Sequence, residues 1–225
     1  MINIVYTNQK CKDVYDVFKK QHDLFCNLPL FVISDYCGDY QYSNEEPYFK
    51  HWLDALKLIE DDYFIYNQED FILYDKVKTD ILFEIRDFLR SNPQYSFVRL
   101  IKSGQNLSTN EIEKNLYLVG DESFPQYSMQ ATIWNKESFI TLYENTQQEK
   151  WFECQSYEDS CKTLKIKGLY YYSNEPKRGG HFDSSIYPYI ATALVRGKWN
   201  LSEYPNELSP LINEYEINVN VRGIH

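Results

Sequence analysis

The stretch DDYFIYNQEDFILYD, residues 61–75, combines an apolar and aromatic run with carboxylates near both ends of that run. Residues 63–66 are apolar or aromatic, residues 67–70 are polar, and a second apolar run follows. This pattern predicts a strand buried on both faces whose polar end lies at one edge of a sheet. Because α/β folds bind ligands beyond the carboxyl ends of their strands, Glu69 and Asp70 are the first candidates for a functional site.

Strand and helix patterns alternate around this segment. Ile2 to Tyr6 and Leu30 to Ser34 are predicted strands, and Cys11 to Phe25 between them has the spacing of an amphipathic helix. A right-handed crossover makes the two strands parallel and brings Thr7 and Asp35 to the same sheet edge. Further helices are predicted from Pro47 to Glu60 and from Lys78 to Arg90, and a further strand from Tyr95 to Ile101. We therefore expect an α/β fold with a mostly parallel central sheet and helices on both faces.

The pattern is less regular beyond Lys102. Ile190 to Val195 is predicted to be helical, and the sequence after it, which contains Pro205 and Pro210, is predicted to be irregular. The remaining elements expected here are short strands at Asn115–Val119, Met129–Trp134 and Leu169–Tyr172, and a helix at Lys136–Asn145. We expect a single domain spanning residues 1–225.

Composition limits the classes of function. Of the 225 residues, 43% are hydrophobic and 17% aromatic, enough for a sizeable core. The net charge of -10 disfavours a nucleic-acid partner, because phosphate contacts require clustered Lys and Arg. The N-terminus MINIVYTNQK does not resemble a signal peptide, and no run approaches the length of a membrane span. Five cysteines without a CxxC pair indicate reduced thiols, so we expect a soluble, cytoplasmic protein.

The adjacent carboxylates Glu69 and Asp70 suit a divalent cation that also binds phosphate oxygens. Neighbouring residues on a regular strand point to opposite faces, so either the strand ends by Gln68 or only one carboxylate is a direct ligand. The alternative is that one carboxylate caps the next turn and the other is solvated. Asp61 and Asp62, roughly 20 Å away along the strand at about 3.3 Å per residue, are expected to belong to a turn.

The order of these features resembles the nucleotide-sugar half of a GT-A glycosyltransferase. More narrowly, the sequence is similar to small glycosyltransferase-like proteins of large viruses and of bacterial surface-polysaccharide loci, over most of the chain from Ile2 to Arg222. The usual GT-A signature is Asp-any-Asp, and here Gln68 and Asp70 occupy that spacing. The segments that carry the resemblance are NQEDFILYDKV (67–77), FVRLIKSG (97–104), YSMQATIWNKESF (127–139), WFECQS (151–156), RGKWN (196–200) and VRG (221–223).

The resemblance implies transfer of a sugar from a nucleoside diphosphate donor to a hydroxyl of a glycan or small-molecule acceptor. Residues 1–102 would form the nucleotide-sugar half and residues 103–225 the acceptor half. Asp70, supported by Glu69, would hold Mn²⁺ or Mg²⁺ on the diphosphate, while Thr7 and Asp35 would contact the base and ribose. A loop-capping role explains Asp35 equally well.

Glu153 is the candidate general base, because Trp151 and Phe152 beside it would desolvate the carboxylate and raise its pKa. Glu149 and Asp183 are the substitutes. The alternative is that the aromatic pair anchors the core and Glu153 points outward.

His181 follows two glycines in the segment KRGGHFD, residues 177–183. It is a candidate third metal ligand, and Lys177 and Arg178 are candidates for neutralising the diphosphate. A lone histidine is more often a surface or core residue. Arg99 either reaches the site from a neighbouring strand or pairs with a core carboxylate.

Two other classes of function remain open. One is a sugar- or nucleotide-binding module without turnover, because α/β folds host many functions. The other is a metal-dependent nucleotidyl or phosphoryl transferase, since paired carboxylates serve those reactions too. The sequence contains no GxxxxGK[ST] phosphate loop, which weighs against the second class.

Overall fold

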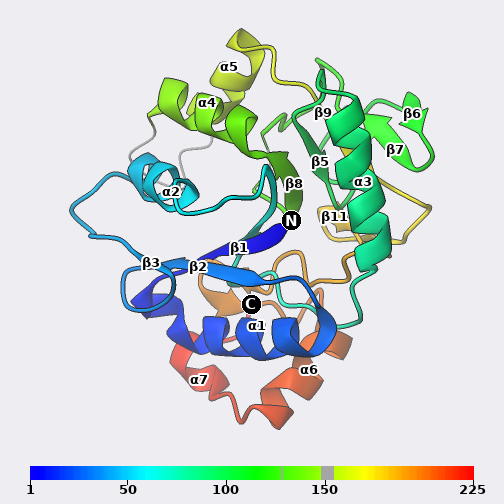
Figure 1. Cartoon of the computed structure of the whole chain (residues 1–225). Coiled ribbons are helices and arrows are strands. Elements are labelled where there is room, and N and C mark those ends of the chain that lie inside the picture. Colours follow the sequence, from blue (N-terminus) through cyan, green and yellow to red (C-terminus); the bar gives the residue numbers. More distant parts are fainter. Residues whose placement is uncertain (128, 148–154) are drawn as a thin grey trace.

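The computed structural model describes residues 1–127, 129–147 and 155–225 (Figure 1). The centre of its sheet comes from the most apolar segments of the sequence. Strands β1 (Ile2–Tyr6) and β2 (Leu30–Ser34) have the predicted bounds, and β4 (Tyr63–Gln68) comes from the stretch 61–75. β1 pairs in parallel with both β2 and β4. β4 is buried on both faces along Tyr63 to Asn67, as the continuous apolar run predicts.

In the described part of the chain the central sheet has nine strands, in the order β3-β2-β1-β4-β8-β5-β9-β7-β6. β8 runs antiparallel to its neighbours β4 and β5, whereas β5 and β9 are parallel. The prediction of a mostly parallel α/β sheet is confirmed. The remaining strands of this sheet are β3 (Tyr40–Gln41), β5 (Phe97–Arg99), β6 (Glu111–Glu113), β7 (Leu116–Leu118), β8 (Thr132–Asn135) and β9 (Gly168–Tyr171).

Helices cover both faces of the sheet (Figure 1). α1, α6 and α7 gather on one side, and α2, α4 and α5 lie on the other. Each main helix turns an apolar stripe inward; in α2, for example, Trp52 packs on Phe64 and Tyr66 of β4. The bounds are η1 (Gln9–Cys11), α1 (Lys12–Phe25), α2 (Tyr48–Leu56), α3 (Thr79–Ser91), α4 (Lys136–Thr146), α5 (Gln155–Thr163), α6 (Pro205–Glu214) and α7 (Val219–Arg222).

The order in which the chain adds strands to the sheet reverses at β1. From β1 it moves outward to β2 and β3, and then returns to place β4 on the other side of β1. Such a switch leaves a crevice beyond the carboxyl ends of the two strands, because their connections leave in opposite directions. This crevice lies next to Tyr6 and Gln68, which are paired in register.

Two predictions for the C-terminal part are wrong. Residues 190–195 are not helical, because the Ile190 N–H donates to the Ile72 carbonyl and Leu194–Val195 forms a strand. The segment with Pro205 and Pro210 is not irregular, because α6 begins at Pro205, whose missing N–H needs no partner in the first helical turn.

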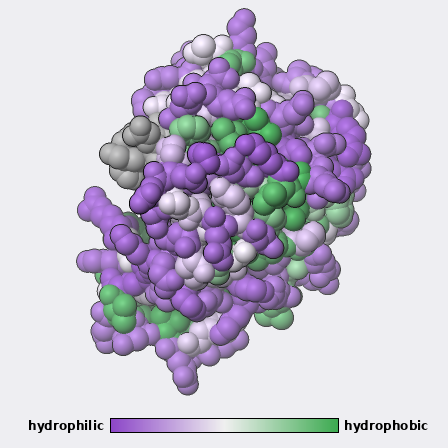
Figure 2. All heavy atoms as spheres, turned by 60° about the vertical axis from the view of Figure 1, so that its left-hand side comes forward, coloured by the Kyte–Doolittle hydropathy of each residue, from purple (hydrophilic) through white to green (hydrophobic). Residues whose placement is uncertain are grey.

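The two halves expected from the sequence are interleaved in the sheet. β8, from the second half, lies between β4 and β5 of the first half. The face in Figure 2 is predominantly hydrophilic, with hydrophobic residues in separate patches. No helix formed by the described residues is both long and apolar enough to cross a membrane.

Candidate functional site

A cavity of about 800 Å³ opens beyond the carboxyl ends of β1, β2 and β4. The residues that line it come from the loops after these strands and from the C-terminal part of the chain. They are Tyr6, Asn8, Lys10, Cys11, Asp35, Tyr42, Asn44, Tyr48, Gln68, Glu69, Asp70, Leu194, Arg196, Gly197 and Arg222. Three of the predicted site residues, Asp35, Glu69 and Asp70, are therefore brought together at the topological switch point.

The turn after β4 directs both acidic side chains into this cavity. β4 ends at Gln68, and a 3.1 Å hydrogen bond from the Phe71 N–H to the Gln68 carbonyl closes the turn. Because Glu69 and Asp70 no longer lie on a strand, they are not forced to opposite faces. The strand geometry therefore does not prevent them from sharing one ligand.

Burial removes the Glu69 and Asp70 carboxylates from water, and few protein groups offset the electrostatic cost of their charges. Desolvation, followed by the charge of Glu69, raises the pKa of Asp70 to about 8. Desolvation also raises the pKa of Glu69, although a hydrogen bond from the Cys11 thiol opposes this effect. Among the described residues neither carboxylate forms an ion pair, and the backbone N–H of Leu194 only partly opposes the rise in the pKa of Asp70. A ligand with positive charge would relieve this electrostatic cost.

Glu69 and Asp70 fit a divalent cation. Mg²⁺ and Mn²⁺ bind one or two carboxylates and complete their coordination with water and phosphate oxygens. In the described part of the chain, no group of three or more His, Cys, Asp or Glu side chains is arranged around a common metal position. A cation at Glu69 and Asp70 would therefore need further ligand oxygens, such as those of a phosphate.

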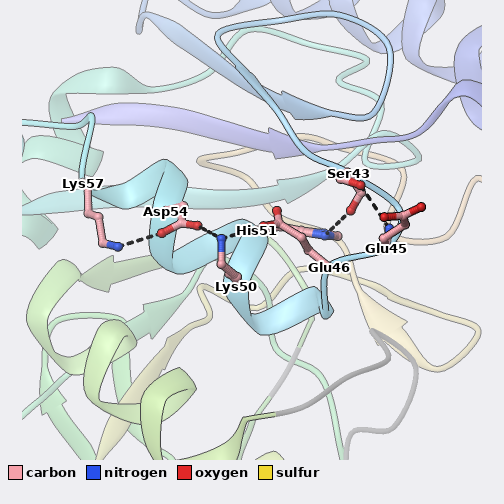
Figure 3. A network of polar contacts seen from close by, with 7 residues as sticks. All are labelled: Ser43, Glu45, Glu46, Lys50, His51, Asp54 and Lys57. Carbon is pink, nitrogen blue, oxygen red and sulfur yellow. Dashed lines mark hydrogen bonds and ion pairs between the residues drawn. The ribbon is translucent and has the colours of Figure 1, made fainter.

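An aromatic wall stands opposite the cations of the cavity lining. The rings of Tyr6 and Tyr42 stack with centroids 5.1 Å apart, and Tyr48 meets Tyr6 edge to face. The Nε2 atom of His51 lies 3.1 Å from the Ser43 carbonyl, so Nε2 must carry the proton. The Nδ1 atom of His51 then accepts a hydrogen bond from the Tyr6 hydroxyl at 3.0 Å, which fixes the Tyr6 ring. Figure 3 shows His51 beside Ser43, with Lys50 held between Glu46 and Asp54. Tyr6 is the half-buried ring of this wall, whereas Tyr42 and Tyr48 are buried.

Asp35 and Thr7 have different positions at the sheet edge. The Asp35 carboxylate accepts the Gln9 N–H at 2.7 Å and the Asn44 amide at 3.0 Å, and it also lines the cavity. Asp35 is thus a loop cap that still has lone pairs for a ligand. Thr7 is fully buried beneath the lining, and its carbonyl accepts the Tyr42 hydroxyl at 3.1 Å. Its side chain does not line the cavity.

Arg99 lies elsewhere, in the core. It is fully buried and donates to the backbone carbonyls of Ser103, Pro125 and Gln126. Burial lowers the pKa of Arg99 to about 10, which the nearby charge of Glu158 opposes. Arg99 therefore lies in the core, as the second alternative expected, but its hydrogen-bond partners are backbone carbonyls rather than a carboxylate.

The segment 177–183 also lies away from the cavity lining. It forms the hairpin β10 (Lys177–Arg178) and β11 (His181–Phe182), as the glycine turn predicts. Arg178 forms ion pairs with Asp183 at 3.0 Å and with Glu207 of α6 at 2.6 Å. Because Arg178 and Asp183 bind each other and His181 is not among the lining residues, the structure does not bring this segment to Glu69 and Asp70.

The candidate base Glu153 and its substitute Glu149 lie outside the described residues. The sequence prediction missed Lys10, Cys11, Arg196, Arg222 and the aromatic wall. RGKWN and VRG contain the two arginines, but nothing in the sequence alone places these segments beside residues 69–70. Arg222 reaches the cavity from α7 and is bound to Asp13 and, at 2.7 Å, to the Lys10 carbonyl.

No protein-family model matches this sequence, and a search of curated protein sequences finds no match. Solved structures share the fold. A cytidylyltransferase from Leptospira borgpetersenii serovar Hardjo-bovis (strain JB197) superposes with a TM-score of 0.51 at 13% identity, covering 97% of this chain and 96% of that chain. The glycosyltransferase GlyE of Streptococcus pneumoniae TIGR4 matches with a TM-score of 0.43 at 9% identity, covering 72% of this chain and 42% of that chain. At such identities the likeness concerns the fold alone, and the predicted GT-A-like α/β class is confirmed.

Proposed function

We propose that this protein transfers a sugar from a nucleoside diphosphate sugar to a hydroxyl of an acceptor, assisted by a divalent cation at Glu69 and Asp70. One observation carries the proposal: two carboxylates that form no ion pairs within the described part of the chain share a cavity with a group of stacked tyrosines and with cationic side chains. A nucleotide sugar has complementary parts, namely a flat base, a ribose diol and a diphosphate.

The residues of the cavity would divide the donor among them. The Tyr6 and Tyr42 wall would stack on the base, and the remaining lone pairs of Asp35 would accept a ribose hydroxyl. Glu69 and Asp70 would hold the cation, which supplies electrostatic stabilisation to the leaving diphosphate. Glu153 remains our candidate for the base that takes the acceptor proton.

A nucleotidyl transferase is the second candidate, because the cytidylyltransferase from Leptospira borgpetersenii shares the fold over nearly the whole chain. The loop after β1 supports the glycosyl reaction instead. Its N–H groups are already used: Gln9 donates to Asp35 at 2.7 Å, Lys10 to the Asn8 side chain at 3.0 Å, and Cys11 to the Asn8 carbonyl at 2.9 Å. A loop that cradles a triphosphate needs free backbone N–H groups, and this loop has few to offer.

Product analysis tests the proposal. The protein is incubated with Mn²⁺ or Mg²⁺, a panel of UDP-, GDP-, CMP- and dTDP-linked sugars, and mono- and oligosaccharide acceptors. Release of the donor's nucleoside phosphate together with a glycosylated acceptor is the expected result. Pyrophosphate release from a nucleoside triphosphate in a parallel panel would instead support the nucleotidyl reaction.

Donor binding can be measured separately by thermal shift, since a ligand that binds only the folded state raises the melting temperature. A shift without any product would identify a binding module. No shift with any donor, with or without the cation, would contradict the proposed function.

A further inference from the structure

A short hairpin beside the cavity contains an arginine, Arg196, in an unfavourable backbone conformation. Strands β12 (Leu194–Val195) and β13 (Lys198–Trp199) pair in antiparallel fashion and are joined by Arg196 and Gly197. The φ angles of these two residues are 51° and 78°. Two successive left-handed residues form a type I′ turn, for which Asn or Gly is preferred at the first position. Arginine in this conformation is strained, and strain of this kind concentrates at functional sites.

The base of the hairpin is fixed on both sides. On the first side, the Ile190 N–H donates to the Ile72 carbonyl at 2.9 Å, which ties the segment leading into the hairpin to the loop that follows Asp70. On the second strand, the backbone N–H of the buried Trp199 donates to the Gly223 carbonyl at 3.1 Å. The backbone carbonyl of Trp199 accepts the His225 N–H at 2.9 Å. The position of Arg196 is therefore set relative to Asp70 by a two-residue turn on an anchored base.

Among the described residues, Arg196 is also the arginine of the cavity whose side chain forms no hydrogen bond or ion pair. Arg222 is bound to Asp13 and the Lys10 carbonyl, so its donors are largely used. Among the described residues neither Arg196 nor Lys10 forms an ion pair. Lys10 is a point charge on a flexible stem, whereas a guanidinium binds two phosphate oxygens at once.

We propose that Arg196 is a catalytic residue that binds the diphosphate of the donor; this inference rests on the proposed function. In the transfer, the acceptor oxygen bonds to the anomeric carbon while the bond from that carbon to the diphosphate oxygen breaks. The electron pair of that bond stays on the diphosphate oxygen, and the acceptor proton goes to a base. Arg196 binds the negative charge that develops on the leaving diphosphate.

Titration with inorganic pyrophosphate in the presence of Mg²⁺ tests this site without requiring turnover. Arg196→Asn should weaken pyrophosphate binding about 10- to 100-fold, the size expected for one or two charge-assisted hydrogen bonds. Lys198→Ala is the matched control: Lys198 is an exposed cation of the same hairpin that does not line the cavity, so affinity should stay within about twofold of wild type. Arg196→Lys, which keeps the charge and the strain, should lie between wild type and Arg196→Asn.

The melting temperature of the variant distinguishes a role of Arg196 in ligand binding from a structural role. Because Asn is favoured in the turn, Arg196→Asn should have an unchanged or higher melting temperature while it loses affinity and turnover. Wild-type affinity of Arg196→Asn for pyrophosphate, or no binding by the wild-type protein, would overturn the proposal. If pyrophosphate binds through Arg196 but no donor yields product, the anion site stands and the proposed function fails.

Discussion

Two charged turns of this protein use the same residue types in opposite ways. In the 177–183 hairpin, Arg178 is bound to Asp183 and Glu207 and lies 5.0 Å from the ring of Tyr204. At the cavity, Glu69, Asp70 and Arg196 form no ion pairs among the described residues. Paired charges hold elements together, whereas unpaired charges in a concave site are available to a ligand. Pairing, rather than residue type, distinguishes Glu69, Asp70 and Arg196 from the charged residues of the 177–183 hairpin.

The largest effect is expected on catalysis. It should follow substitutions in the turn of Glu69 and Asp70, whose charges form no ion pairs among the described residues. Asp70→Asn removes the charge that would hold the cation and keeps one side-chain oxygen. Turnover should fall about 100- to 1,000-fold, a loss typical of removing one electrostatic contribution to the transition state. Steady-state product formation at saturating donor measures it.

The fold of this variant should be intact, and its donor-induced thermal shift should no longer depend on Mn²⁺. A metal-dependent shift equal to that of the wild type would move the cation site away from residues 69–70.

A substitution in the 177–183 hairpin, whose charges are paired, should reduce the stability of the protein rather than its turnover. Arg178→Ala leaves the Glu207 and Asp183 carboxylates without their partner, and should reduce the free energy of unfolding by about 1–3 kcal/mol. Urea unfolding followed by circular dichroism measures this loss. Turnover per folded molecule should remain close to that of the wild type.

The comparison between the two turns fails if Arg178→Ala abolishes turnover without loss of stability. In that case the hairpin would belong to the site despite its position.

A smaller effect is expected at Asp35, which is both a loop cap and a cavity residue. Asp35→Asn should raise the KM for the donor by up to about tenfold with little change in kcat, because one ground-state hydrogen bond is weakened. Asp39→Asn is the matched control, since Asp39 accepts the Val32 N–H at 2.8 Å and does not line the cavity. Equal effects of the two changes on KM would make Asp35 a loop cap only.

The last effect appears only as the pH falls, and it concerns the core beneath β1. Burial lowers the pKa of His22 to about 4, and its Nε2 lies 3.0 Å from the Asn3 amide. Between pH 6.5 and 4 the unfolded chain binds this proton and the folded state does not, so stability should fall as pH decreases through this range. His22→Gln should flatten this part of the profile of urea midpoint against pH, and an unchanged slope would show that other groups are responsible.

Much of the first hundred residues was predictable from sequence. β1 and β2 have the predicted bounds, and α3 begins and ends within one residue of the predicted helix. These elements have strong apolar periodicity, which reports burial directly. The segment 190–195, in contrast, does not form the predicted helix. It is instead an extended chain whose Ile190 bonds to the loop after β4.

The site was predicted in part for the same reason. Asp35, Glu69 and Asp70 follow strands directly, so strand order alone placed them at one edge. Arg196 is more than a hundred positions away in the sequence, and only the hairpin anchored through Ile190 and Trp199 brings it there. Arg99 was misplaced because a charged residue on a strand gives no sign of the carbonyls that surround it.

The sequence by itself determined the α/β class, the central strand with its acidic end, and the edge of the sheet where the cavity opens, because local periodicity and strand direction depend on near neighbours in the chain. Only the tertiary structure decided which charges are paired. Ion pairs such as Arg178 with Glu207, and the absence of one at Arg196 among the described residues, depend on contacts between distant segments that no local pattern encodes.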